Sequence, residues 1–236
     1  CNVFNQYNIV PLFVFDGKPP QIKKDEIERR RNERIINKKK YSELLKTPEK
    51  IEKLSKQQLY DIKRSFLRMT GKDIEMVKNI ITSYGMKYII ADGEADPLCS
   101  KLVNDGIVYA CMTQDMDQMV YKTNTVFRDF DIDNHTVVVY KYENIINKLR
   151  INTFDFTVLC IISGCDYINK DKMDNRRSNI FYHYNLYLKY KKYQKKIKSG
   201  KKGEYHKRLK SYKSFLSWLI DKKYVEFNYK SEEYKK

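Results

Sequence analysis

The chain has 236 residues, enough for one large α/β domain with or without an appendage, and its formal net charge of +17 favours a polyanionic partner. A composition rich in Lys, Tyr, Asn and Ile is also typical of an AT-biased genome, so charge alone does not decide the partner. The five cysteines form no CxxC pair and the three histidines lie far apart, which argues against a zinc site or a His-based triad. No apolar run approaches the roughly 20 residues of a membrane helix and no secretory signal is present, so we expect no membrane association.

The N-terminal third alternates one apolar run with long charged segments. Residues 9–15 (IVPLFVF) predict a buried strand that ends in a turn at Asp16 and the glycine after it. Residues 19–41 predict a highly charged helix with few apolar side chains, which should project from the body. The helical pattern continues over residues 42–69, with a break expected at Pro48.

A cleaner helix is predicted over residues 70–84. Thr70 and Asp73 have the spacing of a capping box, and Gly85 is a typical C-terminal stop. One face of this helix is apolar and should pack on a sheet. Its residues are Ile74, Val77, Ile81 and Tyr84.

The rest of the chain alternates strand and helix patterns before becoming basic. Strands are predicted at 87–91, 107–112, 125–128 and 136–141, and helices at 94–105, 117–121 and 153–163. This alternation predicts an α/β fold with a mostly parallel central sheet flanked by helices. Residues 169–213 are rich in Lys, Tyr and Asn, and their tyrosines suit either base stacking or a core. Residues 214–227 predict one more helix.

Six acidic residues, in four clusters, are the main functional signal. They are Asp16, Glu94, Asp96, Asp115, Asp117 and Asp166. Three clusters follow apolar runs, and the carboxyl ends of parallel strands meet at one edge of a sheet, so these side chains should converge. Buried carboxylates need a compensating charge, and oxygen ligands without His or Cys suit Mg²⁺ or Mn²⁺. Two such ions hydrolyse phosphodiesters. Each acid taken alone also fits a turn or a helix N-terminus.

Two basic residues of the charged helix suggest transition-state contacts. Lys23 and Arg30 are seven positions apart, about two helical turns, and therefore share a face. Above a metal-bound phosphodiester, both would stabilise developing negative charge. The alternative is a solvated charged helix.

The ordered segments FVFDGKPPQIK, GEAD, TQDMD and GCDY, with Arg30 and Arg34 after the first, resemble the flap endonuclease family, the structure-specific 5′ nucleases related to XPG. The resemblance runs from about residue 9 to 167. It implies a PIN-like 5′-nuclease fold, with the six acids as ligands of two Mg²⁺ ions, for which Mn²⁺ is a possible substitute. It also implies that Lys23, Arg30 and Asp16 are catalytic, and that a helical arch over about residues 20–56 orders on a single-stranded 5′ end.

The chain departs from the family pattern at three places. The family usually has Glu where Asp96 stands. It has a further aspartate about fifty residues upstream of FDGKPP, so we expect an N-terminally truncated nuclease. After Asp166 the family's glycine-containing phosphate hairpin is absent from the sequence. Duplex binding would then depend on basic residues, and the candidates are Arg34, Arg176, Arg177, Lys195 and Lys196.

These expectations give a nuclease core over residues 1–167 and a basic helical DNA-binding region over 168–236. The expected function is a metal-dependent structure-specific 5′ nuclease, a flap endonuclease or 5′–3′ exonuclease, acting on DNA with a 5′ flap or 5′ end in replication and repair. The alternatives are a catalytically incomplete nucleic-acid-binding module and an RNA-directed 5′ exonuclease. No sliding-clamp motif is evident, and a monomer is expected. The expected location is intracellular, in the nucleus or at a cytoplasmic viral replication site.

Overall fold

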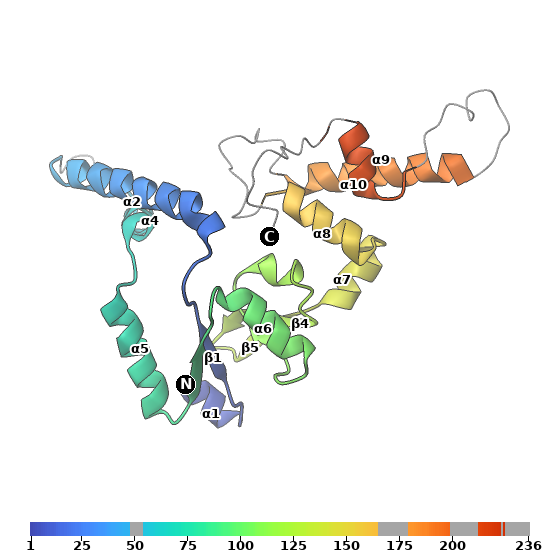
Figure 1. Cartoon of the computed structure of the whole chain (residues 1–236). Coiled ribbons are helices and arrows are strands. Elements are labelled where there is room, and N and C mark those ends of the chain that lie inside the picture. Colours follow the sequence, from blue (N-terminus) through green and yellow to red (C-terminus); the bar gives the residue numbers. More distant parts are fainter. Residues whose placement is uncertain (48–53, 165–178, 199–211, 223, 225–236) are drawn as a thin grey trace. The chain divides into compact units, whose positions relative to one another are not determined.

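The computed structural model of the chain describes residues 1–47, 54–164, 179–198, 212–222 and 224 (Figure 1). The chain divides into two compact units by packing. Unit 1 comprises Cys1–Asp105 and Asp129–Val137, and unit 2 comprises Gly106–Arg128 and Val138–Lys236. This division differs from a boundary at residue 167 because α8 (Thr153–Ile162) packs against helices on the far side of that boundary. The functional division into a nuclease core and a DNA-binding region stays a prediction.

Unit 1 is built around two short parallel strands. Its elements are α1 (Asn2–Gln6), β1 (Leu12–Phe15), the 3-10 helix η1 (Gln21–Lys23), α2 (Lys24–Leu45), α4 (Lys56–Phe66), α5 (Gly71–Ser83), β2 (Lys87–Ile90) and α6 (Ala95–Asn104). The strands pair in register from Leu12 opposite Lys87 to Phe15 opposite Ile90. The ammonium of Lys78 on α5 lies 5.6 Å from the ring centroid of Phe15 and 5.7 Å from that of Tyr88, so cation–π contacts tie α5 to both strands.

The local signals for α5 are confirmed. Thr70 and Asp73 form the capping box, with the Asp73 carboxylate accepting the Thr70 backbone N–H at 2.7 Å. The chain leaves the helix through Gly85 at φ +70°, a conformation that favours glycine. The apolar face is only partly covered, because Ile81 is buried whereas Val77 and Tyr84 are exposed.

The charged segment forms one long helix, as the sequence predicts. α2 has 22 residues, and none of them is buried. It contacts α4, where the rings of Tyr41 and Phe66 lie 5.2 Å apart and Lys63 lies over Tyr41 (Figure 1). Most of the order in α2 must therefore come from helix propensity and ion pairs rather than from burial.

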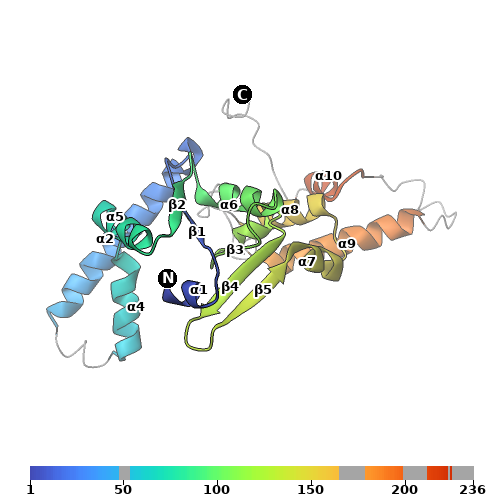
Figure 2. The ribbon, with the colours of Figure 1, turned by 90° about the horizontal axis from the view of Figure 1, so that it is seen from below.

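Unit 2 contains the second sheet and a helical layer. Its elements are β3 (Cys111–Met112), the 3-10 helix η2 (Met116–Met119), β4 (Thr125–Asp131), β5 (Thr136–Lys141), α7 (Tyr142–Leu149), α8, α9 (Ile180–Lys198) and α10 (Phe215–Asp221), with the outer part of the β4–β5 hairpin assigned to unit 1. The strand order is β3-β4-β5, and β3 pairs in parallel with β4 (Figure 2).

The α/β class with parallel pairing is confirmed, but the strands of the described residues form two sheets. The strand predicted at 107–112 is also too long. Gly106 turns at φ +73°, and Ile107 and Tyr109 remain 65% and 75% exposed, so only Cys111 and Met112 pair with β4. Helices α1 and α7 were not expected. In α7 the signal was present, because Tyr142, Ile145, Ile146 and Leu149 follow helical spacing and pack on the core.

The main core lies in unit 2, where α8 contacts α9 and α10. Tyr187 and Phe215 pack edge to face with ring centroids 5.3 Å apart, and Tyr190 packs against both Phe215 and Trp218. Tyr187, Tyr190 and Phe215 are at most 2% exposed. These tyrosines of the basic region are therefore core residues and do not offer stacking surfaces to bases.

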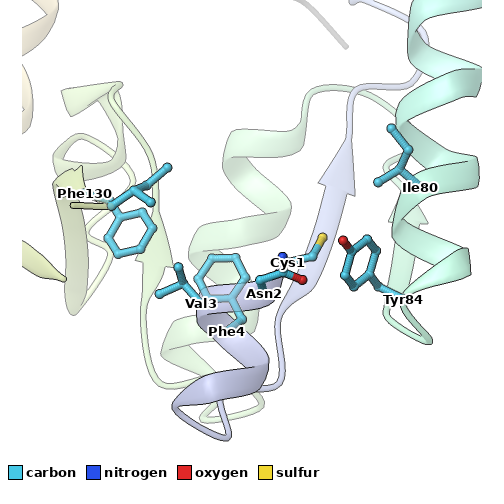
Figure 3. Close-up of a pocket in the computed structure, with 8 residues that line it drawn as sticks. Cys1, Asn2, Val3, Phe4, Ile80, Tyr84 and Phe130 are labelled. Atoms are coloured by element: carbon cyan, nitrogen blue, oxygen red, sulfur yellow. The ribbon is translucent and has the colours of Figure 1, made fainter. Parts of the chain in front are cut away.

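An open pocket of about 300 Å³ lies in unit 1. Figure 3 shows its lining residues, which come from α1, α5 and the β4–β5 hairpin. Its lining is mostly apolar and consists of Cys1, Asn2, Val3, Phe4, Ile80, Tyr84, Phe130 and Ile132. The predicted site residues are not part of this lining. Among the helices of the described residues, none combines the length and apolar character that crossing a bilayer requires.

Candidate active site

The end of β1 is fixed against the start of α6. The backbone N–H of Ala91 donates to the Phe15 carbonyl at 2.9 Å, which extends the β1–β2 ladder past the strands. The Gly17 N–H then donates to the Gly93 carbonyl at 2.7 Å. Between these contacts, Oδ1 of Asp16 accepts the N–H of Ala95, the first residue of α6, at 2.8 Å. Asp16 therefore lies at the N-terminus of α6, where a carboxylate is favoured.

Gly17 is required by this close approach. A Cβ at position 17 would lie 1.9 Å from the carbonyl oxygen of Ala91 and 3.2 Å from the carbonyl carbon of Asp92. Both are backbone atoms and cannot rotate away as a side chain would. After β1, the candidate metal ligand Asp16 is thus followed directly by Gly17, which allows the backbone of this segment to contact that of Ala91 and Asp92.

Glu94 and Asp96 lie in the same turn that receives Asp16. Glu94 is the N-cap residue of α6 in extended conformation, and Asp96 lies in its first turn. Lys23, at the end of η1, forms an ion pair with the Glu94 carboxylate, and the two side chains are 18% and 15% exposed. The structure therefore brings Glu94 together with Asp16 and Lys23, from two stretches of chain about 70 residues apart.

Arg30 and Arg34 lie further along α2. The Nε of Arg30 donates to the Glu26 carboxylate at 2.7 Å, and the Nε of Arg34 donates to the Arg30 carbonyl at 3.1 Å. Arg29 binds the same carboxylate of Glu26 through two nitrogens, each at 2.7 Å. The hydrogen bond from Arg29, then that from Arg30, lowers the pKa of Glu26 to about 2. Glu26 was not predicted, although its spacing of three and four residues from the two arginines is a visible signal.

Asp115 and Asp117 belong to unit 2 and are exposed. Asp115 caps η2, its carboxylate accepting the Asp117 N–H at 2.9 Å, while its own N–H donates to the Thr113 hydroxyl at 3.0 Å. The next residue, Gln118, is fully buried and accepts a hydrogen bond from the Thr123 hydroxyl at 2.7 Å, which anchors the turn. The two exposed carboxylates are thus followed directly by a buried anchor.

The remaining predicted site residues fall into two groups. Asp166, Arg176 and Arg177 lie outside the described residues. Lys195 and Lys196 are exposed in the last turn of α9. Within the described ranges, no three His, Cys, Asp or Glu side chains are grouped closely enough to hold a metal ion. The convergence of the unit 1 acids with Asp115 and Asp117 therefore stays a prediction.

The chemistry of the donor set nevertheless fits one class of metal. The candidate ligands in both units are carboxylates, and hard oxygen donors select Mg²⁺ or Mn²⁺ rather than zinc. Lys23 already places a positive charge against Glu94, and the Asp16 and Asp115 carboxylates accept backbone N–H groups. Each contact holds a carboxylate in a defined orientation while leaving it oxygen lone pairs for a cation.

Comparison with known proteins links this arrangement to a family. The XPG N-terminal domain model matches residues 1–37 and the XPG I-region model matches residues 85–166, together about half of the chain. All six predicted acidic ligands fall within these matched residues.

Flap endonuclease 1 of Cryptosporidium parvum is 34% identical over 176 residues, which is 67% of this chain and 34% of that protein. The catalytic core of Rad2 in complex with a DNA substrate has a TM-score of 0.56 at 19% identity, over 95% of this chain and 63% of that one. Flap endonuclease-1 from Methanococcus jannaschii has a TM-score of 0.52 at 21% identity, over 93% and 74%.

The two solved structures show the 5′-nuclease fold, and the chain spans about a third of the length of its Cryptosporidium relative. The two domain matches, in chain order, agree with the motif series around Asp16, Glu94 and Asp115. The chain therefore belongs to the XPG/flap endonuclease family.

Proposed function

We propose that the protein is a divalent-metal-dependent, structure-specific 5′ nuclease that cuts DNA bearing a 5′ flap or a free 5′ end. The observation that supports this best is the meeting of Asp16, Glu94 and Lys23 at the N-terminus of α6. These residues come from two of the family's motifs, FVFDGKPPQIK and GEAD, and they combine two candidate metal ligands with a candidate catalytic cation. Replication and repair are the processes in which such substrates arise.

The residues that would hold two Mg²⁺ ions, with Mn²⁺ as a substitute, are the six predicted carboxylates. When bound, such ions supply an activated water and neutralise charge on the phosphodiester. In this proposal the chain aligns Asp16, Glu94 and Asp96 through the fixed end of β1, and Asp115 and Asp117 through the anchored turn at η2. Asp96 has the family's charge on a side chain that is one methylene shorter than the usual Glu.

Lys23 and Arg30 would stabilise negative charge on the phosphodiester. Lys23 is held at the carboxylate edge by Glu94, so a phosphate that reaches these acids also meets an ammonium group. Arg30 lies about two helical turns further along α2 and offers a guanidinium for a planar, paired contact with phosphate oxygens.

DNA binding would rest mainly on phosphate contacts. Arg34 on α2 and Lys195 and Lys196 on α9 are candidates among the described residues, and Arg176 and Arg177 are candidates from sequence. The Rad2 core was solved with a DNA substrate, which supports a DNA partner for this fold. Affinity should fall steeply with salt, because each neutralised phosphate releases counterions.

The decisive experiment incubates the chain with a 5′-flap duplex in Mg²⁺ and in EDTA, for the wild type and for the double variant Asp115→Asn/Asp117→Asn. We expect Mg²⁺-dependent cutting near the flap junction by the wild type, and binding without cutting by the double variant. The control is Asp131→Asn/Asp133→Asn, which makes the same charge change at the same spacing in the β4–β5 turn and should cut normally.

Other outcomes would replace the proposal. Salt-sensitive binding without cutting by the wild type would indicate a catalytically incomplete binding module. Preferential degradation of 5′-phosphorylated RNA would indicate an RNA-directed 5′ exonuclease. Unchanged cutting by the Asp115/Asp117 double variant would exclude these two residues as metal ligands.

A further inference from the structure

Glu26 occupies a special position on α2. It lies three residues after Lys23 and four residues before Arg30, and therefore on the helix face that these two cations share. Three hydrogen bonds of 2.7 Å reach its carboxylate. Nε of Arg30 donates to Oε1. Arg29 donates from Nε to Oε2 and from Nη2 to Oε1. The Glu26 side chain is 9% exposed, whereas that of Arg30 is 51% exposed.

This geometry orients Arg30. A guanidinium is planar, so a short contact at Nε fixes the plane of the group and the direction of its two terminal nitrogens. Glu26 is itself held by the two-point contact with Arg29, and Arg29 also pairs with Glu33. The carboxylate is thus a braced acceptor on a helix that buries none of its residues.

Charge gives Glu26 a second effect. Arg29 and Arg30 are adjacent in the sequence, and without the carboxylate between them their guanidinium groups would repel each other. The pKa of about 2 keeps Glu26 ionised at every pH at which a nuclease is assayed. The negative charge of Glu26 also opposes the binding of phosphate groups. An acid at this position would therefore not be favoured if α2 served only to increase the affinity for DNA.

We propose that Glu26 is a positioning residue that holds the Arg30 guanidinium in the orientation required at the scissile phosphodiester. This inference rests on the proposed function, in which Arg30 contacts the reacting phosphate. An alternative role for Glu26 is to stabilise α2 through an ordinary i,i+4 ion pair, which would affect binding and cutting together.

The test measures single-turnover cleavage rates and dissociation constants for a 5′-flap duplex in Mg²⁺. Glu26→Ala should lower the rate about tenfold, because misplacing a contact group slows the reaction, and leave the dissociation constant unchanged or lower. Glu26→Gln keeps the size and one acceptor oxygen, so its rate should fall between those of Glu26→Ala and the wild type. Circular dichroism of each variant reports whether α2 stays folded.

Glu33 provides a matched control. It pairs with Arg29 on the same helix, so Glu33→Ala removes an equivalent charge and one Arg29 contact. The rate of Glu33→Ala should stay within about twofold of the wild type. In an Arg30→Ala background, Glu26→Ala should cause no further loss, because the two residues act through one contact.

Several results would overturn the inference. The first is a wild-type cleavage rate for Glu26→Ala when Arg30→Ala is slow. The second is a double variant whose loss of rate equals the sum of the two single losses. The third is a Glu26→Ala variant that binds the duplex more weakly but cuts it at the normal rate. A wild-type chain that does not cut overturns the proposed function and this inference with it. A wild-type chain that cuts and is slowed by Arg30→Ala, but not by Glu26→Ala, overturns the inference alone.

Discussion

A methyl group at position 17 has no room between β1 and the loop after β2. In Gly17→Ala the new Cβ would start 1.9 Å from the Ala91 oxygen, and contacts below 3.0 Å are essentially never found. The two backbone segments must therefore separate by about 1 Å, which is enough to break the Gly17–Gly93 hydrogen bond at 2.7 Å. The adjacent Asp16–Ala95 hydrogen bond at 2.8 Å lies on the same segment.

The expected loss is a considerable fraction of the stability of a domain. Overpacking of this kind costs about 1–3 kcal/mol, and each broken hydrogen bond costs about 1 kcal/mol more. We expect Gly17→Ala to lower the free energy of unfolding of unit 1 by about 3 kcal/mol, from a typical total of roughly 5–15 kcal/mol. Cutting of a 5′-flap duplex should fall as well, because Asp16 loses its fixed position.

This loss of free energy can be measured locally by hydrogen exchange at increasing urea concentration. The peptides to follow are those that span β1, β2 and the start of α6. Gly71→Ala is the matched control, since a Cβ there meets nothing within 4 Å and such replacements commonly stabilise by about 0.4–1 kcal/mol. Fluorescence of Trp218, the single tryptophan, reports on unit 2. If the free energy of unfolding measured by exchange in Gly17→Ala lies within about 0.5 kcal/mol of the wild-type value, the predicted clash is refuted.

Three further predictions concern single side chains. Lys23→Ala should lower the single-turnover rate by orders of magnitude with little loss of affinity, and weaker binding at a normal rate would make it a simple phosphate contact. Asp155→Ala should destabilise unit 2 by about 2–3 kcal/mol in urea unfolding followed by Trp218 fluorescence, because the buried carboxylate accepts from Asn152 at 2.6 Å and from the Phe215 N–H at 3.4 Å. Burial and the Asp155 charge raise the pKa of Tyr187 to about 12, so unit 2 should lose stability as pH rises from 10 to 12, and Tyr187→Phe should flatten that loss.

The sequence predicted local features where one residue type has one structural role. Thr70 and Asp73 are a capping box in sequence and in structure, and Gly85 ends α5 at positive φ. Residues 153–163 are almost wholly apolar, and α8 is accordingly buried along much of its length. These signals depend on neighbours within one or two turns, so tertiary packing has little scope to change them.

Features that depend on partners distant in sequence were predicted less well. The apolar run 107–112 lacks a strand partner for its first residues, so β3 is limited to Cys111 and Met112. Tyr187 and Tyr190 belong to a basic, tyrosine-rich stretch, yet they face Phe215 and Trp218 in the core. The meeting of Lys23 with Glu94, 71 positions apart, is similarly invisible in composition or periodicity.

Three of the candidate metal ligands are more exposed than their positions after apolar runs predict. Acids at the ends of apolar runs would require a compensating ion if they were buried, but Asp16, Asp115 and Asp117 are exposed, and the Asp16 and Asp115 carboxylates accept backbone N–H groups. Exposure removes most of the desolvation penalty, so burial does not by itself require a metal here. What favours Mg²⁺ is the pure oxygen donor set and the matches to the XPG domains. The Asp16 and Asp115 carboxylates are held in a defined orientation by backbone N–H groups. They therefore need little rearrangement to bind a cation.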